Sequence, residues 1–191
     1  EIFKPLGMND TEFFFDESDF DRLAVVYDVD QEGDFVPATK DRLLLAPNDF
    51  AHGWMSGGGG LVSTAADYTR FMMMLVSEGE LDGKRLLSPV TVSLMLQRNI
   101  AATAGFGANG TTYEAYGSTV GLGGFVLERP GQGGEMGAVG QWGWGGYYST
   151  SAFLSPGNEL TVVVMSQQIP AGAQKSRAAR LAKAIAYGAI E

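Results

Sequence analysis

The last third of the chain restricts the fold most, because it contains strand-like segments joined by a turn. The segments "YYSTSAFLS" (147–155) and "ELTVVVMSQ" (159–167) flank the sequence Ser-Pro-Gly-Asn, which is typical of a β-hairpin. The apolar run 162–164 is continuous, so we predict that the second strand is buried on both faces. A third candidate strand, "GLGGFVLER" (121–129), precedes them, and the three together predict an antiparallel sheet.

A helix is predicted over 174–187, shortly after these strands. Ala178, Leu181 and Ile185 recur at helical spacing, and we expect this apolar stripe to face the sheet. The basic residues of the segment lie largely off the stripe, at Lys175, Arg177, Arg180 and Lys183.

Two further helices are predicted in the middle of the chain. The first covers 64–78, with Thr64 as its N-cap and Asp67 in place of the glutamate of a capping box. The second begins after Ser88 as N-cap, with Pro89 at its first position. Their apolar faces consist of Tyr68, Phe71, Met72 and Leu75 in the first helix and of Val92, Met95 and Leu96 in the second.

The composition excludes several classes of function. A net charge of -9 argues against nucleic acid as a partner and, more weakly, against an anionic membrane surface. No run of about 18 apolar residues occurs, so we expect no membrane span. Cysteine is absent and His52 is the single histidine, so thiolate sites and H-E-x-x-H zinc sites are impossible, and we expect no metal or cofactor. The glycines at 105–110 fit G-x-G-x-x-G, but they lack the flanking strand and helix, and we interpret the match as chance.

A polar hairpin is predicted over 24–36. Its acidic residues Asp28, Asp30 and Glu32 resemble the start of a calcium-binding loop. The twelfth position of that loop is Thr39 rather than glutamate, so the pattern favours a solvated hairpin turn over a calcium site.

Glycine is the compositional outlier, with 27 residues against a usual share of about 7%. The segment "WGWGG" places three glycines among tryptophans at the mouth of a strand. It indicates either a tight turn with packed aromatic residues or an edge strand that lines a ligand cleft. In the second case Gly145 and Gly146 let a substrate lie along the strand, and the N–H of Tyr147 donates to a developing oxyanion. Trp142 or Trp144 would then form an apolar wall.

Three stretches occur together in an order and spacing that resemble a known family. They are "IFKPLGMNDTEF" (2–13), "SGGGGLVSTAADYTRFMMMLVSEGELDGKRLLSPVTVSLM" (56–95) and "WGWGGYYSTSAFLSPGNELTVVVMSQ" (142–167). They resemble the serine β-lactamase-related superfamily, which includes class C β-lactamases, DD-peptidases and β-lactamase-like carboxylesterases. The resemblance covers nearly the whole chain but only the C-terminal half of the family's domain.

The resemblance implies an α/β fold of the β-lactamase/transpeptidase type, with an antiparallel sheet flanked by helices and part of a helical subdomain. Residues 1–191 would form the C-terminal portion of one such domain, with a mostly helical and loop region at 1–118 and three strands and a closing helix at 119–191. Two more strands come from the N-terminal half in this family. We therefore expect an unpaired sheet edge, an uncovered apolar face and, as partner, a missing N-terminal half from the same gene or a second chain.

The motifs of the family indicate where its chemistry lies. Family members use Ser-x-x-Lys as nucleophile and activator, and a tyrosine motif assists proton transfer. No serine of this chain has lysine three residues on, and no tyrosine has asparagine two residues on, so the resemblance implies no catalytic side chain here. Where β-lactamases carry Lys-Thr-Gly, this chain has Trp144-Gly145-Gly146, which resembles the esterase branch. By the same alignment the amide of Tyr147 is the second oxyanion donor.

The sequence thus predicts the C-terminal half of a β-lactamase-like serine hydrolase. A carboxylesterase is favoured, acting through an acyl-enzyme on a serine upstream of this chain, and the portion alone is expected to be inactive. A β-lactamase or DD-peptidase remains an alternative, as does a non-catalytic ligand-binding module of the same fold. The substrate is a small ester or a β-lactam, and the compartment, bacterial cytoplasm or periplasm, is left open.

Overall fold

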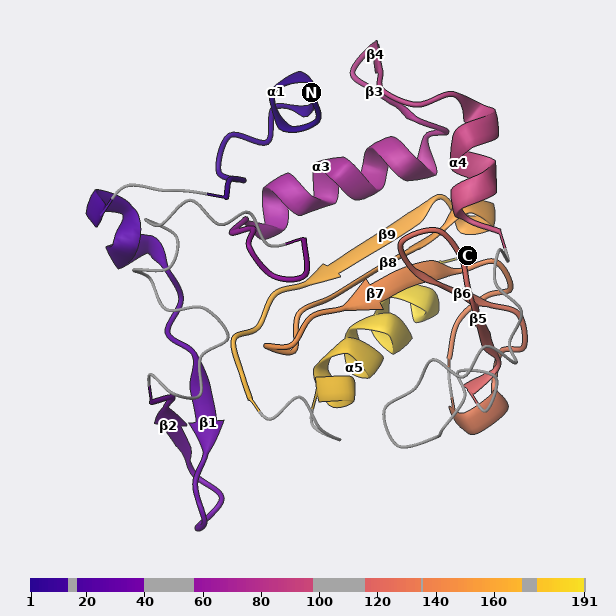
Figure 1. The fold of residues 1–191 in the computed structure, drawn as a ribbon. Coiled ribbons are helices and arrows are strands. Elements are labelled where there is room, and N and C mark those ends of the chain that lie inside the picture. The colour runs from indigo at the N-terminus through magenta and orange to yellow at the C-terminus, as the bar shows by residue number, and fades with distance from the viewer. Residues whose placement is uncertain (14–16, 40–56, 98–115, 135, 170–174, 191) are drawn as a thin grey trace.

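The computed structural model describes residues 1–13, 17–39, 57–97, 116–134, 136–169 and 175–190. A five-stranded antiparallel sheet lies at its centre, with the strands in the order β5-β6-β7-β8-β9. Helix α3 covers one face of this sheet and helix α5 the other (Figure 1). The predicted fold class, an antiparallel sheet flanked by helices, is confirmed. The strands are β5 (Ser118–Val120), β6 (Phe125–Leu127), β7 (Trp142–Gly145), β8 (Ser151–Ser155) and β9 (Leu160–Val164).

Helices and two small hairpins make up the rest of the described chain. None of the described helices is long and apolar enough to cross a membrane. The helices are α1 (Phe3–Leu6), α3 (Ala65–Val76), α4 (Pro89–Met95) and α5 (Lys175–Gly188), with 3-10 turns η1 (Glu17–Arg22), η6 (Gln132–Gly134) and η7 (Pro156–Asn158). The hairpins pair β1 (Tyr27–Val29) with β2 (Phe35–Pro37) and β3 (Glu80–Leu81) with β4 (Lys84–Arg85).

Helix α3 begins as its sequence predicts, but its capping aspartate has a further role. The Thr64 hydroxyl accepts a hydrogen bond from the Asp67 N–H at 3.2 Å. The Asp67 carboxylate does not turn back onto Thr64. Its Oδ2 accepts instead from the Asp10 N–H at 2.7 Å and from the Thr11 hydroxyl at 2.9 Å. Asp67 therefore holds the N-terminal segment against the start of α3.

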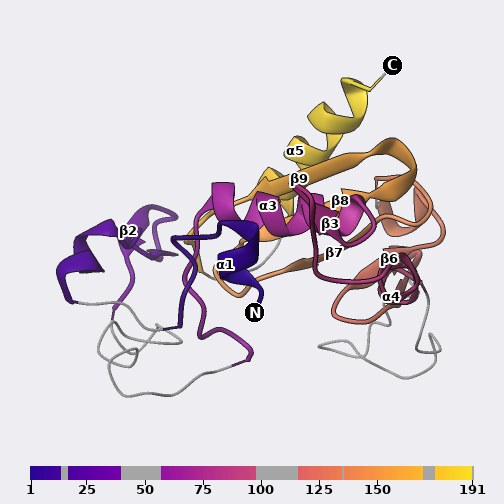
Figure 2. The ribbon, with the colours of Figure 1, turned by 90° about the horizontal axis from the view of Figure 1, so that it is seen from above.

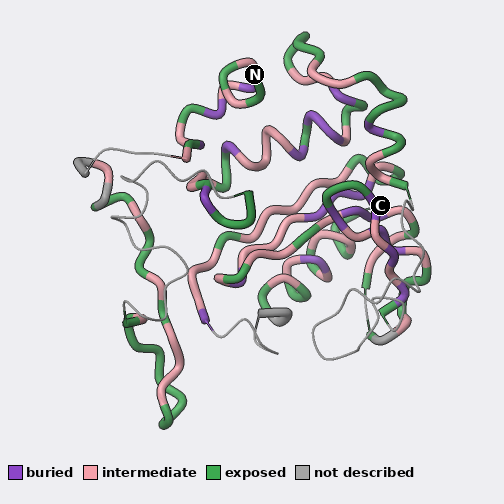
Figure 3. The backbone as a smooth tube through the Cα atoms, viewed as in Figure 1, coloured by how far each residue is buried: buried purple, intermediate pink, exposed green. Residues whose placement is uncertain are grey.

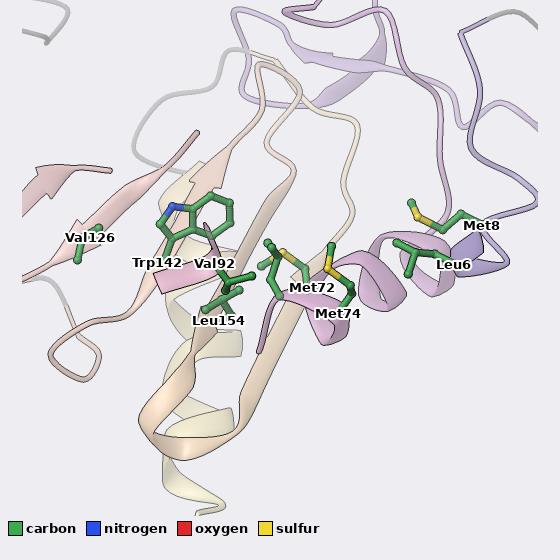
Figure 4. Close-up of a cluster of buried hydrophobic side chains, with 9 residues drawn as sticks. Leu6, Met8, Met72, Met74, Val92, Val126, Trp142 and Leu154 are labelled. Carbon is green, nitrogen blue, oxygen red and sulfur yellow. The ribbon is translucent and has the colours of Figure 1, made fainter. Parts of the chain in front are cut away.

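The core lies between α3, α4 and the near face of the sheet. Met72 and Leu75 of α3 are buried, and Tyr68 and Phe71 pack against them, as the helical spacing predicts. Helix α4 is confirmed as well, because Ser88 caps it through the Thr91 N–H at 3.1 Å. Figure 4 shows side chains from both helices meeting those of the sheet. The buried cluster consists of Leu6, Met8, Met72, Met74, Leu75, Val92, Val126, Trp142 and Leu154.

The sheet has five strands where the sequence predicts three. The three predicted segments contain β6, β8 and β9, and the register of β8 with β9 joins residues 151–155 to 160–164 across the expected turn. Strand β5 was not predicted, and β7 was predicted only as one of two alternatives, a tight turn or an edge strand. Strand β5 has only three residues, and two of the four residues of β7 are glycines, which disfavour strands by propensity. Pairing with neighbouring strands makes them strands, β5 with β6 and β7 with β6 and β8.

Strand β9 is less buried than predicted. All five of its residues are half-buried, although the run 162–164 was expected to be covered on both faces. The sheet order explains the difference, because β9 is the last strand and in the described chain pairs with β8 alone. Its outer edge is therefore open.

Helix α5 lies the other way round from the prediction. Leu181 and Ile185 are 55% and 72% exposed, Ala178 is exposed too, and the buried residue is Lys183. The Lys183 ammonium lies 5.2 Å from the centre of the Phe153 ring. The Tyr187 ring stacks on the Phe153 ring, with the ring centres 6.0 Å apart. The long lysine stem and the tyrosine cover the sheet, so the aliphatic stripe faces away from it. Figure 3 colours the residues of α5 mostly as exposed or intermediate, with one buried position.

The β1–β2 hairpin projects from the body in both views (Figures 1 and 2). The Asp30 carboxylate accepts from the N–H groups of Glu32 and Asp34, at 3.1 and 2.8 Å. Its oxygen is used by the turn itself, and the solvated hairpin predicted from the sequence is confirmed. At its base Tyr27 pairs with the segment after β9, donating to Gln167 and accepting from Ile169, both at 2.8 Å.

Candidate functional site

The glycine-tryptophan segment forms β7, the third strand of the five-stranded sheet. All four of its residues pair with β8, but only Trp142 and Gly143 also pair with β6, so the expected edge strand is wrong for these two residues, whereas Trp144 and Gly145 pair with β8 alone among the described strands. A methyl group on Gly143 would lie 2.5 Å from the Ala152 carbonyl oxygen and 2.8 Å from the Phe153 Cβ. Gly143 is therefore required by packing on β8, and it leaves no space for a ligand.

The two tryptophans of β7 have different surroundings. Trp142 is only 5% exposed and packs in the core with Val126 and Leu154. Its ring lies against the backbone of Gly124, where any Cβ would overlap the indole. Within the described part of the chain the indole N–H has no hydrogen-bond partner. Trp142 is thus a core residue, and the structure leaves Trp144 as the candidate wall of a ligand site.

Trp144 is 50% exposed and forms an aromatic pair with Phe125 of β6. The ring centres lie 4.1 Å apart and the planes differ by 14°, which is a stacked arrangement. Phe125 is paired with Gly143 in the strand register. Because glycine has no side chain, nothing at position 143 separates the Phe125 ring from Trp144. Phe125 was not predicted as a site residue, because the 18 residues between it and Trp144 carry no signal that the two rings meet.

The turn after β7 is fixed at several points. Gly146 donates to the Thr150 carbonyl at 2.8 Å, and a side chain on Gly146 would collide with the Thr150 hydroxyl. Ser149, which has a left-handed backbone (φ 68°), donates through its hydroxyl to the Gln168 carbonyl at 3.0 Å. The Tyr148 carbonyl in turn accepts from the Gln168 N–H at 3.0 Å. These bonds tie the turn to the segment that follows β9.

Tyr147 is the exception within this turn. Its side chain is 48% exposed and meets Tyr148 edge-on, with ring centres 5.4 Å apart. Among the described residues, no backbone or side-chain acceptor is hydrogen-bonded to its N–H. An amide in a half-exposed residue of a hydrogen-bonded turn, without an acceptor in the described chain, can donate to a bound oxygen.

Shifted pKa values occur at two described residues, and neither belongs to β7 or its turn. Burial raises the pKa of the Tyr68 hydroxyl on α3. The hydrogen bond from Arg22 to Asp10 raises the pKa of that guanidinium. His52 and the glycines at 105–110 lie outside the described residues.

Comparison with known proteins supports the resemblance found in the sequence. The family model described as Beta-lactamase matches residues 1–187. Protein Rv1367c of Mycobacterium tuberculosis (strain ATCC 25618 / H37Rv) is 30% identical over 173 residues, which cover 88% of this chain and 42% of that protein.

Two solved structures have the same fold over nearly all of this chain. EstCE1, described as a hydrolase with promiscuous acyltransferase activity, is 26% identical with a TM-score of 0.75, and the match covers 96% of this chain and 48% of EstCE1. Simvastatin synthase (LovD) from Aspergillus terreus has a TM-score of 0.75 at 20% identity, covering 95% and 47% of the two chains. The chain thus spans about half the length of the proteins it matches.

Proposed function

Because the chain belongs to the β-lactamase family, we propose that it is the C-terminal half of a serine hydrolase that cleaves small carboxylic esters. The observation that carries this proposal is the Tyr147 N–H, which follows the side-chain-free residues Gly145 and Gly146 and has no acceptor in the described chain. An ester carbonyl placed there would find a preformed donor for its oxygen. The likeness to EstCE1, a hydrolase that is 26% identical to this chain, also supports this proposal.

In the proposed reaction the nucleophile is a serine from the missing half. Its oxygen bonds to the acyl carbon, and the carbonyl oxygen becomes an oxyanion that accepts from the Tyr147 N–H and from a second amide. The bond from the acyl carbon to the alkoxy oxygen breaks, and the alcohol leaves with the serine proton. Water then attacks the acyl-enzyme, releases the carboxylic acid and returns a proton to the serine.

Trp144 supports an ester over a β-lactam as the substrate. In the β-lactamase branch this position holds a lysine, which together with the following threonine binds the carboxylate of the substrate. A neutral indole supplies no charge for that carboxylate, but it offers apolar surface to an acyl or alkyl group.

The missing half is also the proposed cover for the open surfaces of this chain. The outer edge of β9 and the exposed stripe of Leu181 and Ile185 on α5 would bind additional strands and apolar side chains. Size-exclusion chromatography and urea unfolding of residues 1–191 alone test this part. We expect association or non-cooperative unfolding, and a stable, cooperative monomer would contradict it.

The function is tested on the complete protein with a nitrophenyl ester and nitrocefin as parallel substrates. We expect turnover of the ester and little or none of nitrocefin. Preferred turnover of nitrocefin would favour a β-lactamase, and no turnover of either, with retained ligand binding, would favour a non-catalytic module.

The role of the amide is tested separately by two substitutions at one position. Tyr147→Phe keeps the N–H and should retain most of the activity. Tyr147→Pro removes the N–H and should lower kcat by about 10²–10³, the range found for loss of one oxyanion donor. If a folded Tyr147→Pro variant, judged by its circular dichroism and melting temperature, keeps its kcat, then this amide is not the donor.

A further inference from the structure

Half-buried Phe125 stacks on Trp144, which is 50% exposed and precedes the proposed oxyanion donor Tyr147 by three positions in the chain. We propose that this pair binds a planar aromatic ring of the substrate, so that the enzyme prefers aryl esters; this inference rests on the ester-hydrolase function proposed above. The pair belongs to two neighbouring strands, β6 and β7, whose register is fixed by the sheet. It is therefore held in place before any ligand arrives.

The orientation of Trp144 suits a ligand that stacks. One face of its indole lies against Phe125, with planes 14° apart, and half of the residue's surface remains open. Aromatic rings prefer an offset stacked or edge-to-face contact with such a surface. A flat ring can continue the stack, whereas a saturated ring of the same size is puckered and has no π-system.

The distance along the chain suits a substrate that reaches both places. Trp144 and Tyr147 are three positions apart in the chain, and three residues of extended chain span at most about 11 Å. A ring attached to an ester group can bridge that span directly or through a short linker. The carbonyl oxygen would then lie at the Tyr147 N–H while the ring lies on Trp144.

Surrounding residues keep this surface in place without filling it. Gly143, opposite Phe125, carries no side chain, and Trp142 points into the core. The turn from Gly146 to Thr150 is closed by its own hydrogen bond, which fixes where Tyr147 follows Trp144. Phe125 thus acts as a positioning residue for the indole, and Trp144 is the residue expected to touch the ring.

The experiment compares matched esters on the complete protein. One pair varies the acyl side, methyl benzoate against methyl cyclohexanecarboxylate, and the other varies the alcohol side, phenyl acetate against cyclohexyl acetate. Because these alcohols differ as leaving groups, the alcohol-side result is read only as the change between variants. We expect kcat/KM to favour methyl benzoate over methyl cyclohexanecarboxylate by about three- to tenfold, the range that one aromatic pair supplies, or the ratio of phenyl acetate to cyclohexyl acetate to fall by that factor in Trp144→Leu.

The variants assign that preference to the pair. Trp144→Leu should abolish the preference by lowering kcat/KM for the aromatic substrate several-fold more than for the saturated one, and Trp144→Phe should keep much of it. Phe125→Leu should weaken it and lower the fluorescence anisotropy decay time of the indole. Phe35→Leu is the matched control, because Phe35 is also an exposed aromatic residue (59%) but lies on the distant hairpin (Figures 1 and 2).

A binding measurement separates this inference from the hydrolase proposal. Naphthalene-2-carboxamide contains no cleavable ester, and its affinity is compared with that of the decahydro analogue by tryptophan quenching and calorimetry. If no ester is cleaved but the aromatic amide binds at least threefold more tightly and Trp144→Leu removes the difference, the hydrolase fails and the aromatic site stands. Equal affinities, or a preference that Trp144→Leu leaves unchanged, would overturn the aromatic site.

Discussion

Replacing Asp67 with alanine should cost far more stability than its position in a first helical turn suggests. The carboxylate accepts from the Asp10 N–H at 2.7 Å and from the Thr11 hydroxyl at 2.9 Å, and the residue is buried. Alanine would leave the Asp10 amide without its acceptor, while Thr11 keeps its contact with Ser63 at 2.8 Å. The loss should thus come mainly from the Asp10 amide and from the charge at the helix start.

The magnitude follows from these contacts. A hydrogen bond to a charged group contributes about 1.5–3 kcal/mol, and a negative charge in the first helical turn adds about 0.3–1 kcal/mol. With part of the Thr11 bonding retained, we expect Asp67→Ala to lower the free energy of unfolding by about 3 kcal/mol. Asp67→Asn keeps one acceptor oxygen and should fall between alanine and the natural residue.

Urea unfolding of the complete protein, read at constant m-value, gives the assay. The control is Arg22→Ala, which removes the 2.6 Å ion pair with Asp10 on the same N-terminal segment. Both partners of that pair are exposed, so its loss should change stability far less than loss of the buried Asp67 carboxylate. If Asp67→Ala costs no more than Arg22→Ala, the carboxylate does not hold the segment and the reasoning fails.

Three other results are expected. Gly143→Ala should lower the free energy of unfolding by about 1–3 kcal/mol, as measured by urea unfolding, because the new Cβ would meet the backbone of β8. Gly157→Ala, which has open space around it, should leave stability unchanged, and equal effects of the two substitutions would contradict the close packing. The raised pKa of Tyr68 contributes stability that is fully present below about pH 10 and is lost as the pH rises through the higher folded pKa. Tyr68→Phe should therefore remove part of the loss of stability at alkaline pH in pH-dependent melting, and an unchanged alkaline profile would refute this role of Tyr68. Leu181→Lys with Ile185→Lys should lower the melting temperature of the complete protein but not the yield of residues 1–191 alone, and no change in the former would mean that nothing covers α5.

Helix starts were predictable because they are local. Thr64 and Ser88 each accept from an N–H three residues on, and short sequence patterns contain all that this geometry needs. The other role of Asp67 was not predictable, since its partners Asp10 and Thr11 lie more than 50 residues away. The sequence pattern predicted Thr64 as the cap and Asp67 in the first turn, but it did not predict which groups the Asp67 carboxylate would bind.

The candidate site was predictable as a segment but not as an arrangement. Glycine and tryptophan at 142–146 predicted a place where the backbone is approached closely, and at Gly143 the approaching group is β8 itself. Alternation along β7 did not say which tryptophan is buried, because β7 was expected at an edge. Only the pairing with both β6 and β8 places Trp142 in the core and brings Phe125 to Trp144.

The two wrong burial predictions, for β9 and α5, have one physical cause. Apolar periodicity reports that a face is removed from water in the final assembly, but it does not report which surface removes it. On α5 the sheet is already covered by the Lys183 stem and the Tyr187 ring, whose hydroxyl donates to Gln141 at 3.0 Å. The aliphatic stripe is consequently left for another surface, as is the unpaired edge of β9. Under the proposal above, Leu181 and Ile185 would contact the missing half, which agrees with a chain about half as long as the proteins it matches.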